Sequence, residues 1–481
     1  MSKAIPQSFY WHDYETFGTD PAGDRAAQFA GVRTDADLNV IGEPLLVYCK
    51  PSDDYLPSPR ACAVTGITPQ HAQTHGIIEP EFIKKIHAEL AQPGTCTVGY
   101  NNIRFDDEFT RFALYRNFFD AYAREWQNGN SRWDLLDVVR MTRALRPDGI
   151  EWPVNEDGSV SNRLEHLTAA NGLRHEAAHD ALSDVYATID VARLIRDKQP
   201  RLYSFLLENR SKQPAAAMLN VRDRNMLVHS SGRIPNDSLN TTVVLPICRH
   251  PVNKNGVIVF DLRGNPNALI EFDSEDIADR VFTPVADLPE GEERIPLKQV
   301  HTNKCPVLAP INVLDAASAE RIGIDKIQCE KHRELLIQNI DAVAEKISDV
   351  FASQAFEPIT DPDRMLYSGG FFSADDRRKM DSLRSKTPQQ LASDAMMFDD
   401  GRIAEMLFRY RARNFGDTLS ADEKREWSAH CHARFYEQDG YGQTAYEKFL
   451  AELNECRSEM PEKSAVFDEL MQFVESIRPA A

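Results

Sequence analysis

Apolar and polar positions in the first 200 residues follow the period of strands in some segments and of helices in others. The expected strands cover residues 8–12, 28–34, 39–50 and 95–100. The first is followed by the chain breakers Gly18 and Pro21. Apolar residues recur at helical spacing over 181–195, which predicts a helix that ends near Pro200. Strands interspersed with helices predict an α/β domain with a central mixed sheet over residues 1–200.

A shorter helix is expected before residue 181. Asn162 and Glu165 have the spacing of a capping box, in which each side chain bonds the backbone N–H of the other residue. Asn171 and Gly172 are typical of a helix end.

The pattern changes beyond residue 200. Short β-rich runs cover 226–229, 241–245, 256–260, 295–301 and 305–311, with turns at 253–256 and 264–266. They predict a small β-barrel domain over residues 201–355, with a helical tail from 316 to 351. Residues 356–481 are predicted to form a helical domain, because apolar residues such as Leu470 and Phe473 recur at helical spacing. We therefore expect three domains.

The composition is typical of a protein of the cell interior. The N-terminus lacks the basic and apolar stretches of a signal peptide, and no apolar run approaches the roughly 20 residues of a membrane span. The eight cysteines are widely spaced without a Cys-x-x-Cys pair, which favours reduced thiols over zinc sites or disulfides. We expect a cytoplasmic protein with no membrane partner.

The net charge of −19 argues against a protein that coats DNA, since nucleic-acid binders usually carry a basic surface. Basic residues nevertheless cluster locally. The clusters are Arg111 with Arg116, then Arg201, Arg210 and Lys212, and finally Arg409, Arg411 and Arg413. A narrow positive channel on an acidic body would admit a single strand.

Two acidic residues follow the first expected strand. On a strand, residues i and i+2 face the same side, so Asp13 and Glu15 point together and Tyr14 points away. Adjacent carboxylates repel each other unless a cation lies between them. The alternative is a solvent-facing strand end.

A third acid, Asp106, lies near the start of a helix that follows the 95–100 strand. An aspartate there is often a cap or a partner of the helix dipole, but the strand also delivers it to the place that a metal would occupy. Asp107 and Glu108 are expected to be exposed helix residues.

The last pair is His179 and Asp184, the former just before the 181–195 helix and the latter one turn inside it. Four carboxylates, from Asp13, Glu15, Asp106 and Asp184, can hold two hard divalent cations. A histidine beside them can take a proton from water. This combination is what two-metal phosphodiester hydrolysis requires.

The order Asp-x-Glu, Asp, His-x4-Asp resembles the DEDD exonuclease superfamily in its histidine-type branch. The chain is similar in particular to the bacterial exonuclease I family, whose members degrade single-stranded DNA from the 3′ end. The resemblance is carried by 12–18, 99–108, 131–137, 163–167, 178–181, 301–308 and 410–415. It covers nearly the whole chain.

The resemblance implies an RNase H-like exonuclease domain, an SH3-like β-barrel domain and a helical C-terminal domain. It implies a monomeric single-strand-specific 3′→5′ exodeoxyribonuclease of DNA repair and recombination. Asp13, Glu15, Asp106 and Asp184 would hold two Mg²⁺ ions, for which Mn²⁺ can substitute, and His179 would be the general base. The residues expected to touch the strand or its terminal nucleotide are Glu15, Arg111, Tyr122, Trp126, Arg140, Arg163, Lys212, Asn255 and Tyr367.

The family also implies docking of the C-terminal tail of single-stranded-DNA-binding protein, an acidic peptide with an apolar end. Two other functions stay open. One is an RNA-trimming 3′→5′ exoribonuclease of the same superfamily, which would accept a 2′-hydroxyl at the terminal sugar. The other is a non-catalytic single-strand-binding protein on a nuclease fold. The presence of all five expected metal-binding and catalytic residues argues against it.

Overall fold

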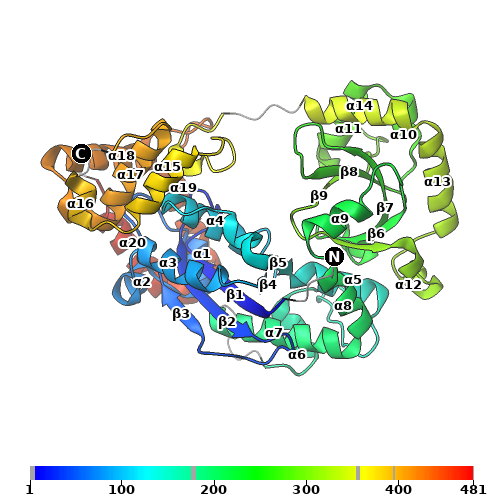
Figure 1. The fold of residues 1–481 in the computed structure, drawn as a ribbon, viewed down its shortest axis with the longest axis horizontal. Coiled ribbons are helices and arrows are strands. Elements are labelled where there is room, and N and C mark those ends of the chain that lie inside the picture. The colour runs from blue at the N-terminus through cyan, green and yellow to red at the C-terminus, as the bar shows by residue number, and fades with distance from the viewer. Residues whose placement is uncertain (1–5, 175–179, 354–357, 394–395, 480–481) are drawn as a thin grey trace. The chain divides into compact units, whose positions relative to one another are not determined.

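The structure is a computed structural model of the chain, and it describes residues 6–174, 180–353, 358–393 and 396–479 (Figure 1). The chain divides into two compact units. The first comprises Met1–Ile5, Arg132–His175 and Ala187–Glu357, and the second comprises Pro6–Ser131, Glu176–Tyr186 and Pro358–Ala481. The second unit therefore combines segments from both ends of the chain.

The second unit is built on strands in the order β3-β2-β1-β4. They are β1 (Ser8–Thr16), β2 (Ala26–Thr34), β3 (Leu45–Tyr48) and β4 (Thr95–Gly99). β1 pairs antiparallel with β2 and parallel with β4, so the predicted mixed sheet is confirmed. The predicted 39–50 strand is too long, because β3 begins only after Pro44, which has no N–H for a ladder bond.

Successive residues of β1 face opposite sides of the sheet. Tyr10 and Tyr14 lie on one side, in a hydrophobic core with Phe29, Phe82 and Leu114. Tyr14 thus points away from Asp13 and Glu15, as predicted.

The helices of this part of the second unit are α1 (Pro59–Thr65), α2 (Pro69–His75), α3 (Glu79–Leu90), α4 (Asp106–Arg116), η1 (Ala123–Glu125) and η2 (Gln127–Gly129).

The C-terminal part of the second unit is helical, as predicted. Its elements are η6 (Pro362–Arg364), α15 (Ala374–Leu383), α16 (Pro388–Ser393), α17 (Gly401–Phe415), η7 (Gly416–Thr418), α18 (Ala421–Tyr436), α19 (Ala445–Glu459), η8 (Pro461–Lys463) and α20 (Ser464–Ser476). Met406 and Tyr410 of α17 join the core on the β1 face, whereas Leu470 and Phe473 of α20 join a second core around Phe17.

The first unit contains an antiparallel five-stranded sheet in the order β10-β6-β7-β8-β9. Its strands are β6 (Leu227–Ser230), β7 (Thr241–Arg249), β8 (Gly256–Asp261), β9 (Leu297–His301) and β10 (Val307–Pro310). Its helical turns and helices are η3 (Asn236–Ser238), α9 (Lys212–Met218), α10 (Asn267–Glu271), α11 (Ser274–Phe282), η4 (Val285–Asp287), η5 (Ile311–Val313), α12 (Ala316–Arg321), α13 (Lys326–Gln338) and α14 (Ile340–Ala352). The predicted β-rich region and its helical tail are both present.

The remaining elements are β5 (Ser131–Asp134), α5 (Leu135–Leu145), α6 (Leu164–Ala170), α7 (Ala181–Lys198) and α8 (Pro200–Glu208). The predicted capping box before α6 is wrong. The N-cap is Arg163, without a side-chain cap bond, because the helix begins one residue later than the Asn162–Glu165 pattern requires. Capping boxes instead begin α18, with Ser420 and Glu423, and α19.

All eight cysteines are free thiols, as predicted. Among the described residues, no helix combines the length and apolar character needed to cross a membrane.

Candidate metal centre and substrate surface

The end of β1 presents two carboxylates on one face of the sheet. Asp13 stands opposite Ala30 of β2 and Glu15 opposite Gln28, so the two acids lie on the side away from the Tyr10–Tyr14 core. Glu15 is only 8% exposed. The alternation of strand residues therefore directs both carboxylates into the same shielded space.

Asp106, the first residue of α4, is joined directly to β1. Its Oδ1 accepts a hydrogen bond from the backbone N–H of Tyr14 at 3.0 Å, and the residue is 2% exposed. β4 leads to this position through a tight loop after Gly99. A Cβ at Gly99 would lie 2.7 Å from the Cβ of Asn102 and 2.9 Å from the carbonyl oxygen of His12, so only glycine fits.

Asp184 completes the acidic group from the first turn of α7. One carboxylate oxygen from each of Asp13, Glu15 and Asp184 lies within 4.8 Å of the others. Such a distance fits oxygen ligands arranged around a divalent cation. The structure thus brings together three of the four predicted metal ligands in this group and holds the fourth, Asp106, against the same strand.

Burial and mutual repulsion act on these carboxyl groups in the same direction. Burial raises the pKa of Asp13 well above its usual range, and the carboxylates of Asp106, Glu15 and Asp184 raise it further. Burial likewise raises the pKa of Glu15 to about 8, with contributions from Asp184, Asp106 and Asp180. A cation would relieve this repulsion and keep the carboxylates ionised.

His179, the predicted general base, lies outside the described residues. The described chain resumes at Asp180, whose carboxylate accepts a hydrogen bond from the N–H of Ser183 at 3.2 Å. This contact lies at the beginning of the helix that carries Asp184.

Besides Glu15, four predicted strand contacts belong to the second unit. Arg111 is 3% exposed and donates hydrogen bonds to Glu125, Glu108 and Tyr367. Trp126 and Tyr367 are 66% and 56% exposed, which is unusual for large aromatic residues. Tyr122 is half-buried, with its ring 6.5 Å from that of Tyr367.

The other four predicted contacts belong to the first unit. Arg163 and Lys212 are exposed, at the starts of α6 and α9. Arg140 forms an ion pair with Asp137 at 2.5 Å. Asn255 precedes β8, and its carbonyl oxygen accepts the N–H of Thr302 at 2.8 Å. No described hydrogen bond links these four residues to one another.

Two expectations about charged residues are wrong. Asp107 is fully buried because its carboxylate accepts a 2.6 Å hydrogen bond from Arg124, and Glu108 is held by Arg111. Glu108 and Arg111 have the i,i+3 spacing at which helical side chains meet, whereas the spacing of Asp107 and Arg124 carried no signal.

The last predicted basic cluster does not form an open positive surface. Arg413 binds Asp54 and Asp363, and Arg409 also binds Asp363, with all four side chains at most 7% exposed. Arg411 pairs with Glu423 at 2.6 Å. These arginines face aspartates and glutamates that are distant in sequence, so proximity along the chain was misleading.

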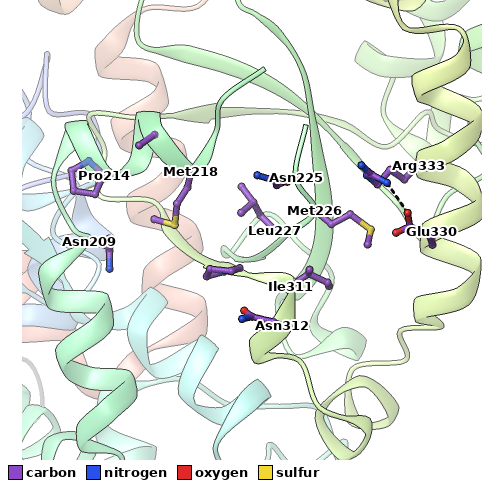
Figure 2. A pocket seen from close by; sticks show the side chains of 12 residues that line it. Asn209, Pro214, Met218, Asn225, Met226, Leu227, Ile311, Asn312, Glu330 and Arg333 are labelled. Carbon is purple, nitrogen blue, oxygen red and sulfur yellow. Dashed lines mark hydrogen bonds and ion pairs between the residues drawn. The ribbon is translucent and has the colours of Figure 1, made fainter. Parts of the chain in front are cut away.

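A cavity of about 750 Å³ lies in the first unit (Figure 2). Met218, Leu227 and Ile311 contribute apolar surface to its lining. Arg333 and Glu330 of α13 form a 2.6 Å ion pair at its edge. The described residues that line it include none of the carboxylate group.

Three family models match the chain. An exonuclease model matches residues 10–192, the exonuclease I SH3-like domain matches residues 210–353, and the exonuclease I C-terminal domain matches residues 360–477. The match to residues 210–353 confirms the predicted SH3-like character of the β-rich region that follows residue 200.

Relatives match from end to end. Exodeoxyribonuclease I of Escherichia coli is 46% identical over 471 residues, which cover 98% of each chain. A solved exonuclease I from Methylocaldum szegediense is 47% identical with a TM-score of 0.92, covering 98% of this chain and 99% of its own. E. coli exonuclease I in complex with a dA16 oligonucleotide is 46% identical with a TM-score of 0.93, covering 98% and 100%.

Two further solved structures, each 45% identical, contain other bound species. One is a zinc-bound E. coli exonuclease I–single-stranded DNA complex, and the other is an ExoI/SSB-Ct complex. Identity of this level over nearly the full length of both chains, together with all three domain models, shows that the chain belongs to the exodeoxyribonuclease I family.

Proposed function

We propose that the protein is a metal-dependent exodeoxyribonuclease that degrades single-stranded DNA from the 3′ end and releases 5′-mononucleotides in DNA repair and recombination. The observation that carries the proposal is the partly buried group of Asp13, Glu15 and Asp184, with Asp106 hydrogen-bonded to the strand of Asp13 and Glu15. Four carboxylates in a shielded place suit hard cations and little else.

The carboxylates fit two divalent ions, which we propose to be Mg²⁺, with Mn²⁺ as a substitute. The zinc-bound relative supports a divalent-metal requirement. When bound, the ions supply activation of the attacking water and stabilisation of the leaving oxygen. Asp13, Glu15, Asp106 and Asp184 hold them, and the shielding of Glu15 and Asp106 limits competition from bulk water.

His179 is the proposed general base. It precedes the helix of Asp184 by a few residues, so its ring can take a proton from the attacking water beside the carboxylates. Arg163 and Glu15 are proposed to hold the terminal nucleotide. Arg111, Tyr122, Trp126, Arg140, Lys212, Asn255 and Tyr367 are proposed to serve the strand upstream of it.

Single-stranded DNA is the proposed substrate because relatives of similar length and fold bind DNA oligonucleotides. The RNA-trimming alternative has weaker support. An oligoribonuclease of Marinobacter nauticus is 24% identical and covers 39% of this chain, so the likeness does not extend over most of the chain.

We also propose three functional domains, 1–200, 201–355 and 356–481, a division supported by the matched ranges 10–192, 210–353 and 360–477. The C-terminal peptide of single-stranded-DNA-binding protein is the proposed protein partner, on the strength of the ExoI/SSB-Ct complex of a relative.

A digest with end-labelled substrates tests the proposal. The purified protein is incubated with single-stranded DNA, blunt duplex DNA and single-stranded RNA in Mg²⁺, with and without a chelator. The proposal expects mononucleotides from single-stranded DNA alone, and none in the chelator. Equal digestion of RNA would favour the exoribonuclease alternative.

A further inference from the structure

Two buried ion pairs join helix α4 to residues 122–126. The Nη2 of Arg124 donates to Asp107 Oδ1 at 2.6 Å, and neither side chain is exposed. Arg111 donates from Nε and Nη2 to the two carboxylate oxygens of Glu125 at 2.7 and 2.9 Å, with side-chain exposures of 4% and 8%. A shielded two-point arginine–carboxylate contact fixes both distance and angle. The segment is therefore held in one orientation on α4.

The same helix holds Tyr367 through its hydroxyl. Arg111 Nη1 donates to the Tyr367 hydroxyl at 3.1 Å and to Glu108 at 2.9 Å, and the hydroxyl donates to Glu108. The ring of Phe112 meets that of Tyr367 edge to face at a centroid distance of 5.8 Å. The tyrosine hydroxyl is thus fixed while more than half of the residue stays exposed.

The fixed groups present aromatic rings to solvent. The Arg111 guanidinium lies 5.4 Å from the centroid of the Tyr122 ring, and that ring lies 6.5 Å from Tyr367. Trp126 follows Glu125 directly and is 66% exposed. Exposed aromatic rings of fixed orientation are what stacking on unpaired bases requires.

We infer that Glu108, Arg111 and Glu125 are positioning residues, which hold Tyr122, Tyr367 and Trp126 as a platform for stacked bases. This inference rests on the proposed single-strand activity and on the strand contacts already proposed for the three aromatic residues, to which it adds the residues that position them. Four hydrogen bonds join the Arg111 guanidinium to Glu108, Glu125 and Tyr367, so Arg111 links the groups on which these rings rest. Because Arg111 lies on the helix that begins with Asp106, the platform keeps a set position relative to that carboxylate.

The test uses Glu125→Gln, which keeps the size of the side chain and weakens its contact with Arg111. Affinity is measured by fluorescence anisotropy, in chelator, for an ordinary single-stranded 20-mer and for one with an internal abasic tract. We expect Glu125→Gln to weaken binding of the ordinary strand about five- to tenfold, within the range of one lost stack. The abasic strand should bind as it does to the wild type, and kcat at saturating DNA should stay within about twofold.

Two further variants and one control complete the design. Tyr367→Phe, which keeps the ring but loses its hydroxyl contacts, should show a smaller loss than Glu125→Gln. Tyr367→Ala, which removes the ring, should lose ordinary-strand affinity at least as strongly. Glu462→Gln makes the same charge change at an exposed position and should leave both affinities unchanged.

Equal losses on ordinary and abasic strands would overturn the inference, since a role in charge or folding does not depend on bases. Unchanged or tighter binding of the ordinary strand by Glu125→Gln would also overturn it. A failure of the proposed function can be told apart from a failure of this inference. The first would appear as an absence of hydrolysis by the wild type in Mg²⁺, whereas the inference is tested by binding measured without metal.

Discussion

The carboxylates of Glu15 and Asp184 lie within 4.8 Å of each other, although one comes from the first strand of the chain and the other from a helix that begins at Ala181. Both are negative when ionised, and Glu15 is nearly buried. Such a contact is stable only with bound protons or a bound cation.

Asp13→Asn should lower turnover by several orders of magnitude while the fold remains intact, because it removes a metal ligand and keeps the side-chain volume. Without metal, the variant should melt no lower than the wild type, since one repelling carboxylate is gone. Thermal melting in chelator, beside single-turnover rates in Mg²⁺, checks both statements. Near-normal turnover would remove Asp13 from the metal site.

Metal affinity should fall as the pH falls. Without a cation, the pKa of Glu15 is raised to about 8 by burial, Asp184, Asp106 and Asp180, so below that pH protons compete with the metal for the carboxylate. Above pH 8 the competition from Glu15 disappears. The Mg²⁺ concentration for half-maximal binding should therefore rise from pH 8.5 to pH 6.5.

Calorimetry in two buffers of different ionisation enthalpy measures this coupling directly. Proton release on Mg²⁺ binding is expected at pH 7. Binding without proton release, and with the same affinity at both pH values, would contradict the competition between protons and Mg²⁺ for the Glu15 carboxylate.

His179→Ala should slow the chemical step by about 10²–10⁴-fold, the usual contribution of a general base. Strand affinity in chelator should change little, because the proposed role concerns only the attacking water. Rapid-quench kinetics on pre-bound substrate separates the two effects. A parallel loss of affinity and rate would make His179 a binding residue.

A buried ion network should stabilise the second unit at neutral pH and lose that contribution in acid. Burial raises the pKa of Asp54, but Arg413 and Arg25 outweigh it, and the pKa lies well below the usual range. A lowered folded pKa gives stability that is present above the unfolded value of about 3.9 and is lost as the pH falls below it.

Asp54→Asn should therefore lower the free energy of unfolding at pH 7 by about 3–5 kcal/mol, since it removes the carboxylate that faces buried Arg25 and one of the two that face buried Arg413. Its stability should also depend less on pH below pH 4. Urea unfolding at several pH values measures this. Asp422 is exposed and pairs with Arg425 at the surface, so Asp422→Asn serves as the control and should change the free energy of unfolding little.

Much of the fold could be predicted from the sequence because period-2 and helical patterns reflect burial directly. The same periodicity placed Asp13 beside Glu15 and turned Tyr14 away, as the structure has it. The partners of Asp107 and Arg413 could not be predicted. Each forms a buried ion pair with an oppositely charged side chain on another element. The pattern of apolar and polar residues along one element contains no information about a partner on another.

The central claim is that the carboxylate site removes nucleotides from the 3′ end of single-stranded DNA. The most direct measurement compares 3′-labelled and 5′-labelled single strands in Mg²⁺, with blunt duplex and circular single strands as controls. We predict immediate release of labelled mononucleotide from the 3′ label, progressive shortening of the 5′-labelled strand, and nearly inert duplex and circles. Immediate mononucleotide release from the 5′ label, or rapid cutting of circles, would contradict the claim.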